Sequence, residues 1–232
     1  MSVIAVCGLP GSGKTLFTTY LMLKHYRKDN NIFKRIFMKN KLKSNVFSNY
    51  PIRFSKSNYC NIISLWDMDK FIKYPDGCDI VFDEFQLYFD SLDFKNFPKT
   101  LRNTFQLHRH FGINNIYLIS QHPSRIVKQA RVLCCEFYEI RKHLRIPLIG
   151  VSIFRYNIYY NFEDYGKPTN VKKSDVVYRF KKRMAFFRYK KVYKAYNTTY
   201  MKSLVENEPL IDNINFTDKN MSISQIYRTF RF

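Results

Sequence analysis

The stretch SVIAVCGLPGSGKTLF, residues 2–17, decides the fold class, because it places three of the chain's seven glycines within six positions. The run before these glycines, Ser2–Cys7, is mostly apolar and β-branched, which is typical of a buried strand. The run after them, Lys14–Lys28, carries apolar and aromatic residues at helical spacing. A lone glycine pair would indicate only a turn. These flanks instead predict the order strand, loop, helix.

The spacing Gly8-x-x-x-x-Gly13-Lys14-Thr15 in this setting matches the phosphate-binding P-loop, or Walker A motif. Glycines let backbone N–H groups approach phosphate oxygens, and the helix adds the positive end of its dipole. Lys14 supplies a positive charge for the β- and γ-phosphates of ATP, and Thr15 supplies a hydroxyl for Mg²⁺. The predicted nucleotide-binding residues are Gly8, Leu9, Pro10, Gly11, Ser12, Gly13, Lys14, Thr15 and Leu16.

A second motif, CDIVFDEF, occupies residues 78–85 and places two acids, Asp83 and Glu84, behind an apolar strand. The carboxyl ends of strands are where α/β sheets gather their ligands. We predict that Asp83 holds Mg²⁺ together with Thr15, and that Glu84 accepts a proton from the attacking water. A surface Asp-Glu pair is the alternative, but phosphoryl transfer beside a P-loop requires these two roles.

Gln121 follows a third predicted core strand, Asn115–Ser120. A polar amide at this place can sense the γ-phosphate or orient water. The alternative is a polar residue that merely begins a loop. The predicted catalytic residues are therefore Lys14, Asp83, Glu84 and Gln121. Further predicted elements are strands at 46–50 and 134–140, and helices at 66–74, 98–111 and 123–131.

The net charge of +21 predicts a polyanionic partner. Residues 172–194 hold ten Lys or Arg and one Asp, with rings that include Phe187 and Tyr189. Basic residues interleaved with aromatics favour single-stranded DNA, because charge pairs with phosphates and rings stack on bases. Two alternatives remain open for this segment. One is a basic helix on an anionic membrane, and the other is a solvated face with a few buried rings.

The pattern changes after residue 150, where Val151–Phe162 alternates apolar and polar residues as a half-exposed antiparallel strand does. We expect a P-loop domain at 1–145, with a mainly parallel sheet flanked by helices. A small basic appendage, β-rich or mixed, is expected at 146–232. The longest apolar candidate for a membrane span, Ile146–Phe154, is far shorter than the roughly 20 residues that a helix needs. We therefore expect no transmembrane segment.

Five cysteines, with no paired metal spacing and no signal peptide, favour a reducing compartment with buried thiols. They are Cys7, Cys60, Cys78, Cys134 and Cys135. The expected location is the host cytoplasm, with peripheral attachment at the inner membrane as the alternative.

Several pieces together resemble the zonula occludens toxin-like (Zot) family, the assembly ATPases of filamentous phages in the HerA/FtsK group of P-loop motors. They are GLPGSGKT, SNYPI, DIVFDEFQ, HRHFGINNIYLISQHPSRI and YKKVYKAYNTTY. The resemblance covers roughly residues 2–200. It implies the same nucleotide, Mg²⁺ and sensor residues as above, a homo-oligomeric ring, and DNA extrusion at the inner membrane. Family members usually carry a transmembrane helix after the ATPase domain, and this sequence departs from them there.

These observations predict an ATP-hydrolysing viral motor that moves, packages or extrudes phage DNA during virion assembly. The catalytic arginine of such motors usually comes from a neighbouring subunit, and Arg109, Arg125 and Arg131 are candidates. A membrane contact would be made either with anionic lipid or with a membrane-embedded assembly partner. Two other functions stay open: a P-loop nucleotide or small-molecule kinase, and a basic scaffold protein at a membrane surface.

Overall fold

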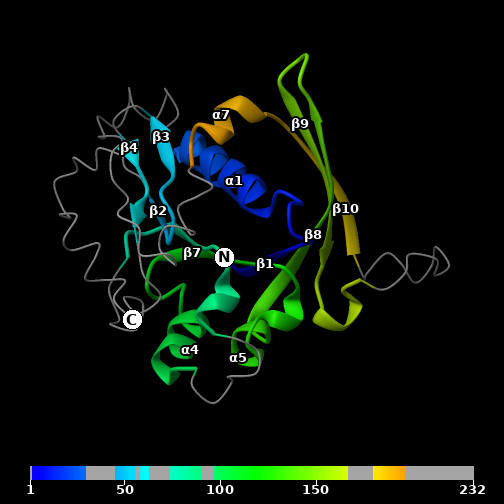
Figure 1. The fold of residues 1–232 in the computed structure, drawn as a ribbon. Coiled ribbons are helices and arrows are strands. Elements are labelled where there is room, and N and C mark those ends of the chain that lie inside the picture. The colour runs from blue at the N-terminus through cyan, green and yellow to red at the C-terminus, as the bar shows by residue number, and fades with distance from the viewer. Residues whose placement is uncertain are drawn as a thin grey trace. The chain divides into compact units, whose positions relative to one another are not determined.

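The computed structural model describes residues 2–29, 45–55, 58–62, 74–89, 97–166 and 180–196. These residues form an α/β fold around an eight-stranded sheet with the order β10-β9-β8-β1-β7-β6-β2-β5 (Figure 1). The strands are β1 Ser2–Cys7, β2 Val46–Ser48, β5 Asn61–Ile62, β6 Cys78–Phe82, β7 Ile113–Ser120, β8 Cys134–Ile146, β9 Val151–Tyr159 and β10 Phe180–Arg188. A separate pair joins β3 Arg53–Ser55 to β4 Asn58–Tyr59.

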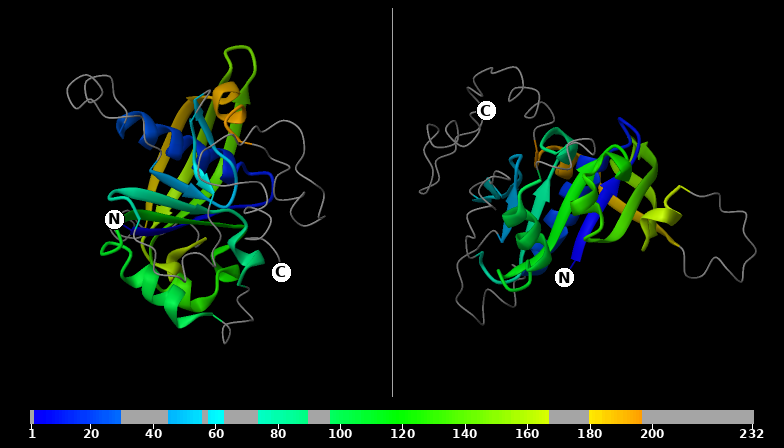
Figure 2. Two further views of the ribbon diagram at one scale, coloured as in Figure 1. Left: turned by 90° about the vertical axis from the view of Figure 1, so that its left-hand side faces the viewer. Right: turned by 90° about the horizontal axis from the view of Figure 1, so that it is seen from below.

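The described helices lie on both sides of this sheet. Helix α1, Lys14–Asp29, covers one face, and the short helices α4, Lys99–Gln106, and α5, Lys128–Arg131, lie on the other (Figures 1 and 2). Helix α7, Tyr189–Tyr193, packs beside α1. The described residues also contain three short 3₁₀ turns: η1 Phe85–Leu87, η3 Pro123–Arg125 and η4 Phe162–Asp164.

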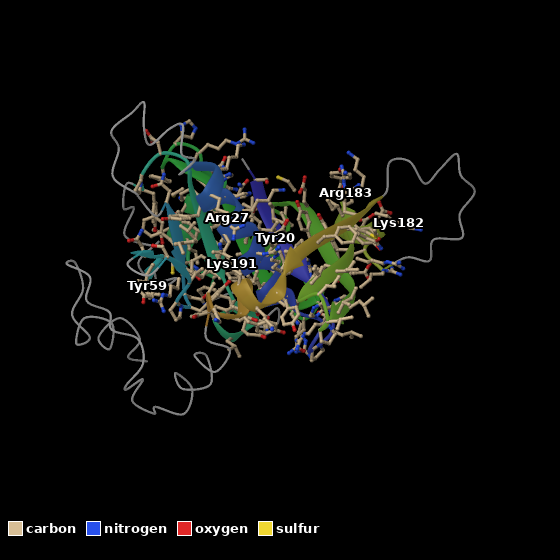
Figure 3. All side chains as sticks on the ribbon, turned by 90° about the horizontal axis from the view of Figure 1, so that it is seen from above. Tyr20, Arg27, Tyr59, Lys182, Arg183 and Lys191 are labelled. Atoms are coloured by element: carbon tan, nitrogen blue, oxygen red, sulfur yellow. The ribbon has the colours of Figure 1, made fainter. Side chains whose placement is uncertain are left out.

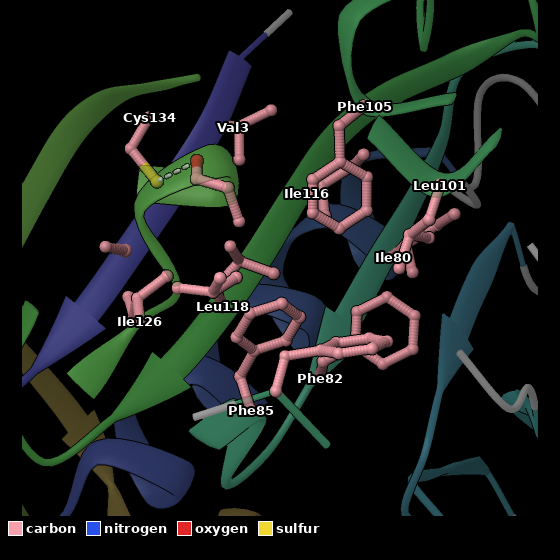
Figure 4. Packing of buried hydrophobic residues seen from close by; sticks show 14 of the residues in the cluster. Val3, Ile80, Phe82, Phe85, Leu101, Phe105, Ile116, Leu118, Ile126 and Cys134 are labelled. Atoms are coloured by element: carbon pink, nitrogen blue, oxygen red, sulfur yellow. Dashed lines mark hydrogen bonds between the residues drawn. The ribbon is translucent and has the colours of Figure 1, made fainter. Parts of the chain in front are cut away.

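The parallel half of the sheet forms around β1, which pairs in parallel with β7 on one side and with β8 on the other. Strand β6 is buried along its whole length, as is most of β1 and the second half of β7. Strands covered on both faces read as continuous apolar runs, which is why the sequence predicted them well. Side chains from these strands, η1 and α4 form the core on the α4 side (Figure 4), including Ile80, Phe82, Phe85, Phe105, Ile116 and Leu118.

The antiparallel half of the sheet consists of β8, β9 and β10, and β9 is antiparallel as predicted. It ends at Tyr159 instead of Phe162, and Asn157, which the alternation placed on the polar face, is buried. Strand β9 pairs antiparallel with β8 and with β10. The β8–β9 register shifts between Ile140 and Lys142, and Pro147–Gly150 closes the turn between these strands. The predicted domain boundary at 146 falls at this turn, with strands of one sheet on both sides of it. The boundary stays a prediction.

By backbone contacts, Met1–Tyr196 is one compact unit. A second unit, Asn197–Phe232, lies outside the described residues. None of the helices in the described part of the chain is long and apolar enough to cross a bilayer.

Several predicted elements need correction. The helix predicted at 98–111 ends at Gln106, after which turns lead to Gly112, whose φ is +79°. The helix predicted at 123–131 is two short turns, because the backbone is extended at Ile126 and Val127. The strand predicted to end at Ile140 runs on to Ile146.

Cys135 is exposed, whereas the other four thiols are buried as predicted. The helix predicted at 66–74 lies almost wholly outside the described residues, as do 172–179 of the basic segment.

Candidate nucleotide-binding site

The loop between β1 and α1 has the conformation that its glycines predict. Gly13 has a φ of +85°, and a Cβ built on it would lie 2.9 Å from Cε1 of Phe154. Both the backbone angle and the contact therefore require glycine here. The Gly13 carbonyl then accepts the first helical hydrogen bond, from Phe17 N–H at 2.8 Å. Leu9 lies at the loop's surface with 79% of its area exposed.

Lys14 is buried, with 6% of its surface exposed, and its side chain folds back over the loop. Its Nζ donates to the carbonyl oxygens of Gly8 at 3.0 Å and Leu9 at 3.2 Å. No carboxylate of the described residues forms an ion pair with it. Ser12 Oγ, also buried, has no hydrogen-bond partner in the described part of the loop. A buried cation and an unpaired hydroxyl within a turn of backbone N–H groups suit a phosphate chain.

Thr15 and Asp83 join the two sequence motifs directly. Thr15 Oγ1 donates to Asp83 Oδ2 at 2.9 Å, although the residues are far apart in the chain. Hydroxyl and carboxylate oxygens are the hard ligands that Mg²⁺ prefers. Thr15 and Asp83 therefore fit the role of Mg²⁺ ligands, which stays a prediction.

Asn49 holds Asp83 from the other side, and no sequence motif predicted a role for it. Its Oδ1 accepts from Asp83 N–H at 2.8 Å, and its Nδ2 donates to the Asp83 carbonyl at 2.9 Å and to the Tyr88 hydroxyl at 3.0 Å. Asn49 is fully buried at the end of β2, next to β6. The available signal was a polar amide directly after an apolar strand, inside the SNYPI piece. Asn49 thus fixes the backbone that carries Asp83.

The electrostatics of Asp83 suit a cation site. Burial, and then the nearby charge of Glu84, raise the pKa of the Asp83 carboxyl to about 6. Its hydrogen bond from Thr15 and the charge of Lys14 act in the opposite direction. An anion that is costly to hold without a partner gains most from a bound divalent cation.

Glu84 adopts a left-handed backbone conformation, with φ 47° and ψ 46°. It is the only non-glycine residue with positive φ in the described part of the chain. Its N–H donates to Asp83 Oδ1 at 3.0 Å, and its carboxylate accepts from the Gln86 amide. Such backbone strain is concentrated at functional sites. Here it turns the chain sharply from β6 into η1.

Gln121 reaches the loop through its backbone. Its carbonyl accepts the Gly8 N–H at 3.2 Å, while its side-chain Oε1 accepts from Arg125 at 2.8 Å. The structure therefore places Gln121 beside the P-loop with its amide directed at Arg125. Arg131 lies over the Phe162 ring at 4.2 Å, and Arg109 is exposed. The sensor role and the choice among the three arginines stay predictions.

Comparison with known proteins gives the family. The family model Zonular occludens toxin (Zot) matches residues 2–200. The chain belongs to this family. The crystal structure of the N-terminal domain of zonular occludens toxin from Neisseria meningitidis is similar at 19% identity, with a TM-score of 0.53, over 84% of this chain and 98% of that one. That likeness shows the α/β fold of the family domain.

Two structures of viral enzymes are more distant matches. The genome packaging NTPase B204 of Sulfolobus turreted icosahedral virus 2, in complex with ATP-gammaS, is 12% identical with a TM-score of 0.36, over 63% of this chain and 78% of that one. The DNA-packaging ATPase B204 from Sulfolobus Turreted Icosahedral Virus is 13% identical with a TM-score of 0.42, over the same shares. No curated protein sequence matches the chain significantly.

Proposed function

We propose that this chain is an Mg²⁺-dependent ATPase that moves, packages or extrudes phage DNA during virion assembly. One observation carries the ATPase part: the Thr15–Asp83 hydrogen bond, which brings the Walker A and Walker B motifs together beside the buried Lys14. Membership of the Zot family supports the assembly part. A homo-oligomeric ring remains part of this proposal.

Each residue of the site has a defined task in this proposal. The loop N–H groups and Lys14 bind the β- and γ-phosphates, and Thr15 and Asp83 hold Mg²⁺, which neutralises charge on the phosphates when bound. Glu84 accepts the proton of the attacking water, and Gln121 orients that water. Asn49 keeps Asp83 in place through its three hydrogen bonds.

Strand β10 supplies the surface that fits DNA. No acidic residue occurs in 180–196, where Lys182 and Arg183 are exposed (Figure 3). Arg188 is exposed as well. Phe186, 54% exposed, lies on the same face of β10 as Lys182 and Arg188, because side chains alternate along a strand, and its ring is accessible to a base. The sequence suggested Phe187 as one of the stacking rings. Phe187 is instead buried, and its ring centroid lies 4.2 Å from that of Tyr20. We therefore propose Phe186 and its basic neighbours as the contact for single-stranded DNA.

The turn between β8 and β9 supports a second candidate, a peripheral contact with an anionic membrane. Leu148 and Ile149 at this turn are 96% and 62% exposed. Arg145 nearby is held by Tyr193, whose hydroxyl accepts its hydrogen bond, and by the Tyr189 ring at 5.2 Å. Exposed aliphatic side chains beside basic residues are typical of surfaces that contact anionic bilayers.

Steady-state hydrolysis of MgATP tests the proposed activity. Lys14→Ala should lower turnover by about 10²-fold or more, because the phosphates lose a preorganised cation. Lys24→Ala, on the exposed side of the same helix, is the matched control and should keep wild-type turnover. Equal turnover in wild type and Lys14→Ala would show that this loop is not the hydrolytic site.

A further inference from the structure

Four nearly parallel rings from four different elements form one continuous stack. Tyr20 of α1 stacks on Phe187 of β10 at 4.2 Å and 12°, measured between ring centroids and planes. Phe187 stacks on Phe154 of β9 at 5.3 Å and 14°. Phe154 stacks on His143 of β8 at 4.2 Å and 15°. The stack therefore connects α1 and the edge strand β10 to β8.

The His143 end of this stack lies against the P-loop. A Cβ on Gly13 would lie 3.3 Å from His143 Nδ1 and 2.9 Å from Phe154. Phe154 also packs on Phe17, in the first turns of α1, with ring centroids 5.7 Å apart. The two rings thus flank the site where the loop becomes the helix.

The position of the metal ligands sets the direction of a bound nucleotide. Thr15 bonds to Asp83, the residue directly after β6, so phosphates that carry Mg²⁺ would lie toward that strand. In the sheet order, β8 and β9 lie on the opposite side of β1 from β6. The nucleoside at the other end of the triphosphate would therefore extend toward β8 and β9, where His143 lies beside the loop.

His143 has the properties of a stacking platform. Its Nε2 lies 3.0 Å from Ser152 Oγ, and this hydrogen bond fixes the ring orientation. The ring is half-buried, and within the described residues no second ring stacks on the face opposite Phe154. Burial, and then the charge of Arg145, lower the pKa of His143, which keeps its imidazole neutral at pH 7.

We infer that the face of His143 turned away from Phe154 stacks on the nucleobase of the bound nucleotide. The substrate class is then a nucleoside triphosphate, distinguished from inorganic polyphosphate by this contact. The inference rests on the proposed nucleotide site. It adds to it a base-binding residue that neither motif contains.

Calorimetric binding of two Mg²⁺-loaded probes, ATP and inorganic tripolyphosphate, tests this assignment in the full chain. His143→Gln removes the ring but keeps a polar group that reaches Ser152. It should weaken ATP binding about tenfold, the loss of one base–aromatic stack, and leave tripolyphosphate binding within twofold. His143→Phe keeps a ring and should retain ATP affinity. His110→Ala, at an exposed turn, is the control and should bind both probes as wild type does.

The outcomes separate this inference from the proposed function. Wild-type binding of neither probe would contradict the nucleotide site itself. Unchanged ATP affinity in His143→Gln would overturn the base contact while leaving that site intact. An equal loss for both probes would also overturn it, because His143 would then only support the loop. Loss confined to ATP, with recovery in His143→Phe, is the expected result.

Discussion

The parallel and antiparallel halves of the sheet differ in where they carry polar, basic and aromatic side chains. In the parallel half, β1, β6 and β7 are largely buried on both faces, and polar side chains occur mainly where the strands end, as Asp83 and Asn49 do. In the antiparallel half, one face packs rings against α1 and the other carries exposed basic and apolar side chains. Strand β8 belongs to both, because it pairs in parallel with β1 and antiparallel with β9. In the function that we propose, the parallel half binds the phosphates and Mg²⁺, whereas the antiparallel half contacts the polyanion and, through His143, the nucleobase.

The largest expected effect separates two adjacent rings of the antiparallel half. Phe187→Ala should lower the free energy of unfolding by about 3–5 kcal/mol, because it removes a buried ring from between Tyr20 and Phe154. Phe186→Ala, one residue away and half-exposed, should change it by about 0.5 kcal/mol or less. Chemical denaturation of both variants measures this. Equal losses would mean that the two rings do not face opposite sides of β10.

Within the parallel half, Glu84→Gln should separate binding from chemistry. The amide keeps the shape but accepts no proton, so hydrolysis should fall by about 10²-fold while ATP binding stays within a few-fold. Glu163→Gln, in the exposed turn η4, is the control and should have no effect on either. Loss of binding together with turnover would make Glu84 a ligand or a structural residue instead of the base.

Asp83→Asn should stabilise the nucleotide-free protein at pH 7 and above by about 2 kcal/mol while abolishing Mg²⁺-dependent hydrolysis. The pKa of Asp83 is raised to about 6 in the folded protein, so ionisation of this carboxyl costs stability. The cost is complete above pH 6 and absent below about pH 4, where the carboxyl is protonated in both states. Unfolding curves across this range check the prediction. A gain that persists at pH 4 would assign it to something other than charge.

The smallest effect concerns DNA. Phe186→Ala should weaken single-stranded DNA binding about tenfold without changing the slope of log affinity against log salt, because stacking releases no counterions. Val132→Ala, another exposed apolar position, should leave binding unchanged. Fluorescence titrations at several salt concentrations measure both values. A changed slope with Phe186→Ala would show that the ring acts through the placement of charges.

The sequence predicted most strands of the parallel half, because buried parallel strands and a P-loop leave strong local patterns. It missed β5 and the first two residues of β7, and it placed the end of β2 two residues too late. Ser2–Cys7 and the start of α1 at Lys14 match the structure. The hydrogen bonds from Asn49 to Asp83 were not predicted, because they depend on β2 lying next to β6, and no local sequence pattern indicates that pairing. In the antiparallel half the strand β9 was predictable from alternation. The burial of Phe187 was not, because it depends on packing against Tyr20, far away in the chain.

DNA-stimulated ATP hydrolysis tests the assignment of the two halves most directly. A triple variant reverses three positive charges on β10: Lys181→Glu, Lys182→Glu and Arg183→Glu. The variant Lys14→Ala instead disables the P-loop. We expect the triple reversal to keep basal hydrolysis but to lose stimulation by single-stranded DNA, whereas Lys14→Ala should bind DNA with turnover lowered by about 10²-fold or more. Wild-type stimulation in the triple reversal, or wild-type turnover in Lys14→Ala, would contradict the proposed division of roles.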